Sequence, residues 1–285
     1  MPGPPTTRRV NGDGISLNVA IWKGAGKPVI CLHGITANCR SWDTMAASLG
    51  SKHHLIALDL RGRGKSDKPP SGYSLEHHLR DIYNLMDGLG LQRAVLMGHS
   101  LGAFISLVFA AQHPELTDRL ILIDGGGKLS PGRMDNILIA IKPALERLGK
   151  VFPSPEAYLE AMKQTPYINP WSESIEEYYR YEIVEVEGGV QANLNPDHIK
   201  EEADNIRRLD PAEYYSKVKC ETLIIRATEG LAADDDLLLP DPVLKLMIKS
   251  IPRSRVYDVS GLNHFGLVFQ PHQGRDRAIL SFLEE

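Results

Sequence analysis

The 285-residue sequence predicts an α/β fold, in which a mostly parallel sheet is flanked by helices and one helical segment interrupts the series. Short apolar runs rich in β-branched residues alternate along the chain with segments of helical spacing, as they do where helices join parallel strands. This alternation stops between residues 129 and 218, where helical patterns dominate, and it then resumes. The chain is long enough for such a sheet to have a substantial core.

The first part of the chain contains five expected strands. Apolar runs predict strands at 15–22, 28–34, 54–62, 93–98 and 118–126, and helical spacing predicts helices at 37–50, 74–90 and 101–114. The continuous apolar run PVICLHG at 28–34 is typical of a strand covered on both faces. Ser74 is the expected N-cap of its helix, and Gly50 ends the helix before it.

The second part of the chain contains the interruption and two further strands. Helical patterns cover 134–149, 154–164, 173–182 and 197–209, and Gly188-Gly189 predicts a small hairpin within 185–194. Strands are then expected at 221–228 and 254–261, with helices near 241–251 and 273–284. We therefore expect a core domain of residues 1–128 and 219–285, with residues 129–218 as a separate helical domain.

Charge and cysteine content exclude several classes of partner. The chain has 32 basic and 36 acidic residues and a formal net charge of −4, so we expect neither nucleic acid nor an anionic membrane as a partner. Cys31, Cys39 and Cys220 are too few and too scattered for a disulfide framework or a zinc site. The N-terminal stretch lacks the apolar run of a secretory signal, and the sequence therefore predicts a cytoplasmic protein.

The stretch GHSLG carries the clearest chemical signal. It places Ser100 where a predicted strand ends and a predicted helix begins, between Gly98 and Gly102. Small flanking residues permit a sharp turn that exposes the serine hydroxyl at the sheet edge, and the helix N-terminus adds positive potential there. Ser100 is therefore the candidate nucleophile.

A serine nucleophile needs a base and a site for the developing negative charge. His264 follows the last predicted strand by a few residues, at the edge of the sheet where ligands bind in such folds, and is the candidate base. The N–H of Leu101, directly after the nucleophile, is one expected oxyanion donor. The N–H of Ile35, in the loop after CLHG, is the other.

The chain resembles the α/β-hydrolase superfamily over nearly its whole length. The matching stretches, in the order of that family, are HGITANCRSW, DLRGRGKSD, GHSLGA, LILIDGG and GLNHFG. The resemblance implies a mixed sheet of eight strands, a helical cap between strands six and seven, and a serine–histidine–acid site. It is strongest to the small-molecule hydrolases with a helical lid, so that residues 129–218 are expected to form that lid.

The acid of this site has two candidates. In the family it commonly follows strand seven, where DLLLP matches an Asp-x-x-x-Pro pattern and nominates Asp236. The other known position is the end of strand six, where Asp124 directly follows LILI. A buried strand end holds a carboxylate more firmly than a long loop with three adjacent acids. We therefore expect Asp124 to be the acid, with Asp236 as the alternative.

These features predict a hydrolase that forms an acyl-enzyme on a small ester, amide or activated C–C bond. No dinucleotide-binding glycine pattern and no cluster of metal ligands is present, so neither a cofactor nor a metal is expected. The expected partner is a small-molecule substrate, and the expected assembly is a monomer or homodimer. Two alternatives remain on the same scaffold: a cofactor-free oxygenase or lyase that uses His264 as base, and a non-catalytic receptor for a small ligand.

Overall fold

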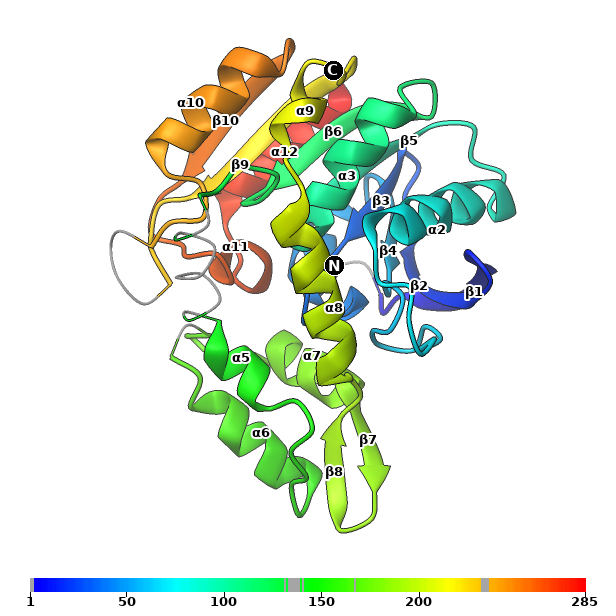
Figure 1. Ribbon diagram of the computed structural model, residues 1–285, viewed down its shortest axis with the longest axis vertical. Coiled ribbons are helices and arrows are strands. Elements are labelled where there is room, and N and C mark those ends of the chain that lie inside the picture. Colours follow the sequence, from blue (N-terminus) through cyan, green and yellow to red (C-terminus); the bar gives the residue numbers. More distant parts are fainter. Residues whose placement is uncertain (1–2, 131, 133–138, 140, 167, 232–235) are drawn as a thin grey trace.

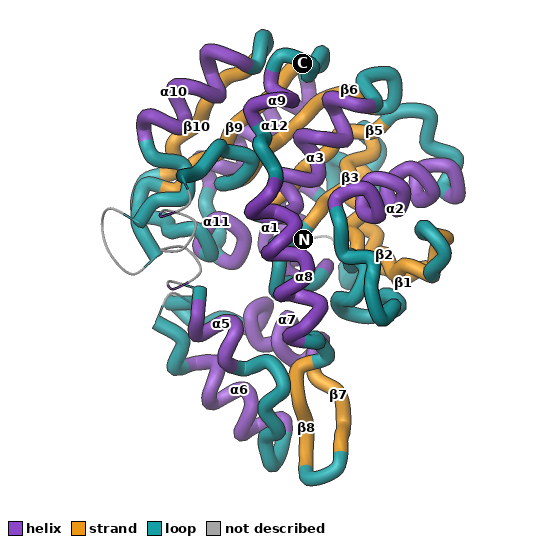
Figure 2. Tube along the Cα trace, in the orientation of Figure 1, coloured by secondary structure: helices purple, strands orange, loops and turns teal. Residues whose placement is uncertain are grey.

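The computed structural model describes residues 3–130, 132, 139, 141–166, 168–231 and 236–285, and an eight-stranded sheet forms its centre (Figures 1 and 2). Across the sheet the strands follow the order β1 (Thr6–Asn11), β2 (Ser16–Trp22), β4 (His54–Leu58), β3 (Pro28–Leu32), β5 (Ala94–His99), β6 (Thr117–Ile123), β9 (Glu221–Ala227) and β10 (Ser254–Val259). The β1–β2 and β2–β4 pairs are antiparallel, and the remaining pairs are parallel. The predicted mostly parallel sheet is confirmed.

Helices cover both faces of this sheet. Those that follow the core strands are η1 (Cys39–Trp42), α1 (Asp43–Leu49), α2 (Leu75–Gly88), α3 (Leu101–Gln112), α10 (Asp241–Ser250), α11 (Gly266–Phe269) and α12 (Gln273–Glu284). The apolar residues of α1, α11 and α12 belong to one hydrophobic cluster and those of α2, α3 and α10 to another, so that the sheet lies between two apolar layers. Burial on both faces explains why β3, β5 and β6 are continuous apolar runs in the sequence.

The apolar pattern of the sequence does not predict β1. Five of its six residues are exposed, and only Val10 is buried. It forms one edge of the sheet and pairs with β2 alone, so neither of its faces needs an apolar residue at alternate positions. With β1 the sheet has the eight strands that the family resemblance implied, one more than the apolar runs indicate.

The chain between β6 and β9 leaves the sheet. Its described part contains α5 (Lys142–Glu146), α6 (Pro155–Lys163), α7 (Glu173–Glu182), β7 (Ile183–Val186), β8 (Gly189–Ala192), α8 (Pro196–Arg208) and α9 (Ala212–Tyr215). In Figure 1, α5, α6, α7 and the β7–β8 hairpin form a lobe below the sheet, and α8 leads from the hairpin back to it. The predicted hairpin is confirmed, whereas much of the helix expected at 134–149 lies outside the described residues.

The end of this inserted segment lies against the core. Helix α9 contacts α3 and α10, and Tyr215 belongs to the same apolar cluster as those helices. The division of the chain into a core and a cap at residues 129 and 218 stays a prediction. Among the described helices, each is too short or too polar to cross a lipid bilayer.

Candidate active site

Ser100 lies at the sharp turn between β5 and α3, at the carboxyl edge of the sheet. Its backbone has φ 54° and ψ −117°, a conformation that L-residues rarely adopt. A Cβ on Gly98 would lie 2.1 Å from the carbonyl oxygen of Gly102, and a Cβ on Gly102 would lie 2.0 Å from that of Leu32. Both glycines are needed to bring strand and helix this close. The predicted strand–turn–helix around Ser100 is confirmed.

The loop after β10 carries His264, which forms a hydrogen bond with Asp124 at the end of β6. Nδ1 of His264 and Oδ2 of Asp124 are 2.9 Å apart. Both side chains are buried, with 4% of His264 and 1% of Asp124 exposed. Because a carboxylate only accepts hydrogen bonds, His264 carries its proton on Nδ1, and its Nε2 can accept one.

The backbone of β9 holds Asp124 in place. Asp124 has φ 45°, and its N–H donates to the carbonyl of Ile225 over 2.8 Å. The N–H of Ala227 donates to Oδ1 of Asp124 over 3.3 Å. One carboxylate oxygen is thus bound to the neighbouring strand while the other faces His264, so the carboxylate cannot rotate without losing a hydrogen bond.

Asp236, the alternative acid, lies in the loop after β9. Its Oδ1 accepts a hydrogen bond from the N–H of Leu231, within the same loop. Nδ1 of His264 donates its hydrogen bond to Asp124 instead. The structure therefore brings Asp124 and His264 together, whereas Asp236 forms a hydrogen bond within its own loop.

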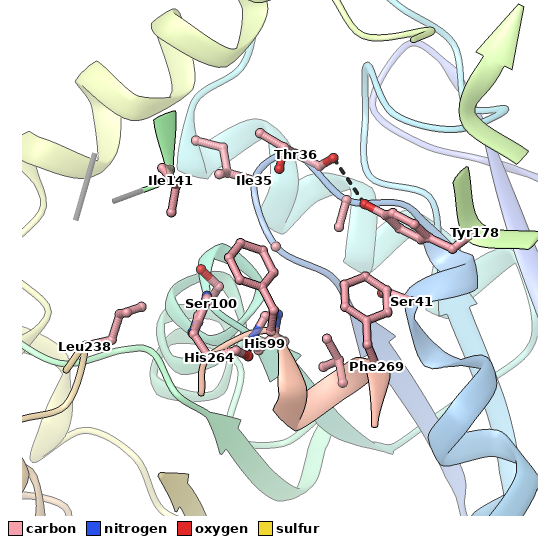
Figure 3. A pocket seen from close by; sticks show the side chains of 14 residues that line it. Ile35, Thr36, Ser41, His99, Ser100, Ile141, Tyr178, Leu238, His264 and Phe269 are labelled. Carbon is pink, nitrogen blue, oxygen red and sulfur yellow. Dashed lines mark hydrogen bonds between the residues drawn. The ribbon is translucent and has the colours of Figure 1, made fainter. Parts of the chain in front are cut away.

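Ser100 and His264 line one small cavity (Figure 3). The volume of this cavity is about 50 Å³. The rest of its lining is mainly apolar and comes from Gly34, Ile35, Thr36, Ala37, Ser41, His99, Ile141, Tyr178, Leu238, Phe265, Val268 and Phe269. Among the described residues, no hydrogen bond joins Oγ of Ser100 to Nε2 of His264. In many unliganded active sites such a contact forms only when substrate binds.

The two expected oxyanion donors lie next to Ser100. Leu101 is the first residue of α3, and the N–H of the following residue, Gly102, donates to the carbonyl of His33 over 3.2 Å. Ile35 lines the cavity. A Cβ on Gly34 would lie 3.4 Å from Cβ of Ser100, so glycine lets this loop approach the turn closely. Within the described part of the chain, the N–H groups of Ile35 and Leu101 have no hydrogen-bond acceptor.

His99, which precedes Ser100, is a residue of the site that was not predicted from the sequence. Its ring stands 4.3 Å from that of His264, centroid to centroid, and its Nε2 donates to the carbonyl of His264 over 3.0 Å. Burial lowers the pKa of His99 well below its usual range, and the nearby His264 lowers it further. A neutral His99 adds no like charge at this distance from the ring of His264. A histidine in an otherwise apolar strand was the available signal.

His33, at the end of β3, is a second buried neutral histidine. Its Nε2 accepts from the N–H of Leu60 over 3.1 Å, and its Nδ1 therefore donates to the carbonyl of Gly34 over 2.8 Å. Burial lowers its pKa from 6.5 to about 4.

This pKa predicts how stability depends on pH. Between pH 6.5 and 4 the unfolded chain binds a proton at His33 that the folded chain does not bind. The free energy of unfolding should therefore fall by about 3 kcal/mol from this group as the pH is lowered through that window. Urea unfolding of His33→Asn at both pH values should show a decrease that is smaller by this amount than in the wild type. An equal decrease in both proteins would contradict the assignment.

Within the described residues, no group of three or more histidine, cysteine, aspartate or glutamate side chains is placed to hold a metal ion. The three cysteines are free and buried. Part of the acidic run at 234–236 lies outside the described residues.

Comparison with known proteins relates the whole arrangement to one family. Residues 27–271 match the family described as alpha/beta hydrolase fold. A 2-(acetamidomethylene)succinate hydrolase of Mesorhizobium japonicum is 40% identical over 118 residues, which are 41% of this chain and 42% of that protein. A Klebsiella pneumoniae protein, provisionally named carbamate hydrolase RutD, is 27% identical over 87% of this chain and 88% of its own length.

The similarity extends to solved structures. The crystal structure of an E-2-(acetamidomethylene)succinate hydrolase has a TM-score of 0.86 and 26% sequence identity, and the match covers 99% of this chain and 100% of that one. The chain spans only 36% to 42% of the length of the curated relatives to which it is 38% to 40% identical. The family match, in contrast, includes every core strand from β3 to β10. The chain therefore belongs to the alpha/beta hydrolase fold family.

Proposed function

We propose that this protein is a cofactor-independent serine hydrolase in which Ser100 is the nucleophile, His264 the general base and Asp124 the acid that orients it. The observation that carries the proposal is the 2.9 Å hydrogen bond between His264 and Asp124, on a histidine that shares a cavity with Ser100. A serine on a strained turn, a base with an available nitrogen and a buried carboxylate are the parts that nucleophilic acyl transfer requires.

In the proposed reaction, Oγ of Ser100 attacks the carbonyl carbon of an ester, amide or activated ketone, and Nε2 of His264 takes the hydroxyl proton. The tetrahedral intermediate collapses, and His264 returns the proton to the leaving group, whose bond to the acyl carbon breaks. Water then attacks the acyl-enzyme, again giving its proton to His264, and the acid is released as Oγ regains a proton. Asp124 orients the imidazole of His264 and stabilises the imidazolium.

The negative charge of the tetrahedral intermediate needs two fixed donors. The N–H groups of Ile35 and Leu101 fit this role because they flank Ser100 and have no acceptor among the described residues. Leu101 also begins α3, where the helix N-terminus favours negative charge. Donors of this kind act without reorganisation at the moment of reaction.

The acyl group that fits this cavity is uncharged. Among its described lining residues there is neither lysine nor arginine. The arginines that contact the backbone of its wall, Arg63 and Arg147, are already paired with Glu202 and Glu182. Burying a carboxylate without a cationic partner is strongly unfavourable. We therefore propose that this chain differs from its relative named for a succinate derivative, which is a dicarboxylic acid.

The inserted segment serves as a cap over this site. Ile141 and Tyr178 belong to it and line the cavity opposite Ser100 (Figure 3). A volume of about 50 Å³ holds only a few atoms, whereas ligand pockets have about 300–1,000 Å³. A more open cavity of about 420 Å³ shares Ile35 and Ile141 with it. Lys200 and Arg207 line that second cavity, so the uncharged group is the acyl portion that lies next to Ser100. Substrate binding therefore requires that the cap move, and the shared residues mark where the two cavities would join.

A matched pair of esters tests the proposal. p-Nitrophenyl butyrate and mono-p-nitrophenyl succinate have the same leaving group and similar acyl lengths, but only the succinate carries a carboxylate. We expect kcat/KM for the butyrate to be at least about 100-fold higher, because the unpaired charge must be desolvated. A faster reaction with the succinate would contradict the uncharged acyl site.

Other outcomes would replace the hydrolase itself. If neither ester were cleaved and a fluorophosphonate failed to label Ser100, the proposed nucleophile would be wrong. Oxygen uptake with an aromatic substrate would then favour the oxygenase alternative, and saturable binding without turnover would favour a receptor.

We also propose a cytoplasmic location. The three cysteines are free and buried, as is usual for proteins of a reducing compartment.

A further inference from the structure

Three consecutive carbonyl groups in the loop after β3 are each held by a buried side chain. The carbonyl oxygens of residues 34, 35 and 36 accept hydrogen bonds from Nδ1 of His33, Nε of Arg63 and Nη2 of Arg147, over 2.8, 3.1 and 2.9 Å. The N–H of Ile35, the proposed oxyanion donor, belongs to the first of these three peptide units. Because peptide units are planar, holding three in succession restricts the backbone torsions between them.

Each of the two arginines is paired with a glutamate from the inserted segment. Arg147 binds Glu182 of α7 through Nε and Nη2, over 2.8 and 3.0 Å. Arg63, which belongs to the core, binds Glu202 of α8 through Nη2, and His78 of α2 binds the other oxygen of Glu202. Both arginines and both glutamates are at least 96% buried, since their exposed fractions lie between 0% and 4%.

Arg147 and Glu202 are charged in the folded protein. Burial lowers the pKa of Arg147, but the neighbouring Glu182 outweighs this effect, and the pKa lies well above the usual value. Burial raises the pKa of Glu202, but Arg63 and His78 outweigh it, and the pKa lies below the usual value. Apolar side chains of similar size often stabilise a fold as well as a buried ion pair does. Stability alone therefore does not explain two such pairs on one loop.

We propose that Glu182 and Glu202 are positioning residues for the oxyanion hole. They orient Arg147 and Arg63, which hold the loop so that the N–H of Ile35 points at the reacting carbonyl oxygen. Both glutamates lie on the inserted segment, so a competent oxyanion hole requires that this segment be docked on the core. The inference rests on the proposed function and adds to it a coupling between cap closure and transition-state stabilisation.

The glutamine variants Glu182→Gln and Glu202→Gln test this proposal. Each keeps the shape of the side chain, removes its charge and leaves one accepting oxygen in place of two, so the partner arginine is held less firmly. We expect kcat for p-nitrophenyl butyrate to fall about 10- to 100-fold, because loss of an entire oxyanion donor costs about 10²–10³-fold. KM should stay within about threefold, since the ground state makes little use of this donor.

A transition-state analogue separates positioning from a general loss of structure. The tetrahedral adduct of butylboronic acid with Ser100 places an oxygen where the oxyanion forms. In the glutamine variants, the affinity for butylboronic acid should fall by the same factor as kcat. Burst-phase acylation by p-nitrophenyl butyrate should still occur at Ser100. Unchanged affinity in variants with reduced kcat would overturn the proposal.

Glu201→Gln provides the matched control. Glu201 is the neighbour of Glu202 on α8 and also joins the inserted segment to the core, because it accepts hydrogen bonds from the N–H groups of Gly72 and Tyr73 over 3.2 and 2.9 Å. It contacts neither of the arginines that hold the loop. We expect kcat of this variant to stay within about twofold of the wild type, a difference of about 0.4 kcal/mol. An equal loss of kcat in Glu201→Gln would show that weakening any contact between the inserted segment and the core lowers kcat. It would overturn the specific positioning role of Glu182 and Glu202.

An apolar replacement keeps the proposal falsifiable if the single variants fold poorly. The triple variant Arg147→Met, Glu182→Leu, Tyr158→Phe removes the ion pair together with the tyrosine hydroxyl that donates to Glu182. We expect a Tm near that of the wild type and a kcat lowered at least about tenfold. Wild-type kcat in this variant would overturn the positioning role and leave the hydrolase intact. If the wild type itself showed neither esterase activity nor fluorophosphonate labelling, the proposed hydrolase function would be wrong.

Discussion

Replacing Ser100 by alanine should lower kcat for p-nitrophenyl butyrate by at least about three orders of magnitude and abolish labelling by a fluorophosphonate. The variant retains the cavity, the proposed oxyanion donors and the His264–Asp124 pair, but it has no atom that can form the acyl-enzyme. The φ of 54° strains alanine about as much as serine, so the free energy of unfolding should change little. Turnover rates and fluorophosphonate labelling of the purified variant would test the loss of activity. Circular dichroism during unfolding would test whether stability is retained.

Ser41→Ala is the control for this experiment. Ser41 lines the same cavity, is 2% exposed and belongs to η1 instead of the turn after β5. We expect this variant to be labelled and to keep kcat within about fivefold, a loss of about 1 kcal/mol. If Ser100→Ala retained labelling, or if Ser41→Ala lost it, the assignment of the nucleophile would be wrong.

Replacing Asp124 by asparagine should lower kcat about 10⁴-fold, because it imposes the wrong tautomer on the base. The N–H of Ala227 donates to Oδ1 of Asp124, and this contact keeps the oxygen of the asparagine amide on the side of β9. The amide nitrogen then faces Nδ1 of His264 and donates to it, so the ring proton moves to Nε2. With its proton there, His264 cannot accept the proton of Ser100.

The matched control is Asp236→Asn. The same chemical change in the loop after β9 alters a residue that accepts a hydrogen bond from the N–H of Leu231, away from Nδ1 of His264, and kcat should stay within about tenfold. Asparagine adopts a positive φ more readily than most residues, so Asp124→Asn should fold despite the φ of 45°. If Asp236→Asn showed the large loss and Asp124→Asn stayed within tenfold, Asp236 would be the acid.

Structural features that depend on residues close together in the sequence could be predicted from the sequence alone. The turn at Ser100 is one, because Gly98 and Gly102 lie within two residues of it and their lack of a Cβ permits the strand and helix to meet. The parallel strands are another, because burial on both faces requires a continuous apolar run. Edge strand β1 escaped prediction because it buries little and so leaves no periodic pattern.

Features that join distant parts of the chain were decided only by the tertiary structure. Two aspartates fitted the sequence as partner of His264, and the parallel pairing of β6 with β9 is what directs Asp124 toward it across 140 residues. The contact of Arg147 with the loop at residue 36 spans 111 residues, and that of Arg63 with Glu202 spans 139. A local sequence pattern predicts which face of a helix or strand is buried. It does not predict which distant side chain contacts that face, because this depends on how all the elements pack together.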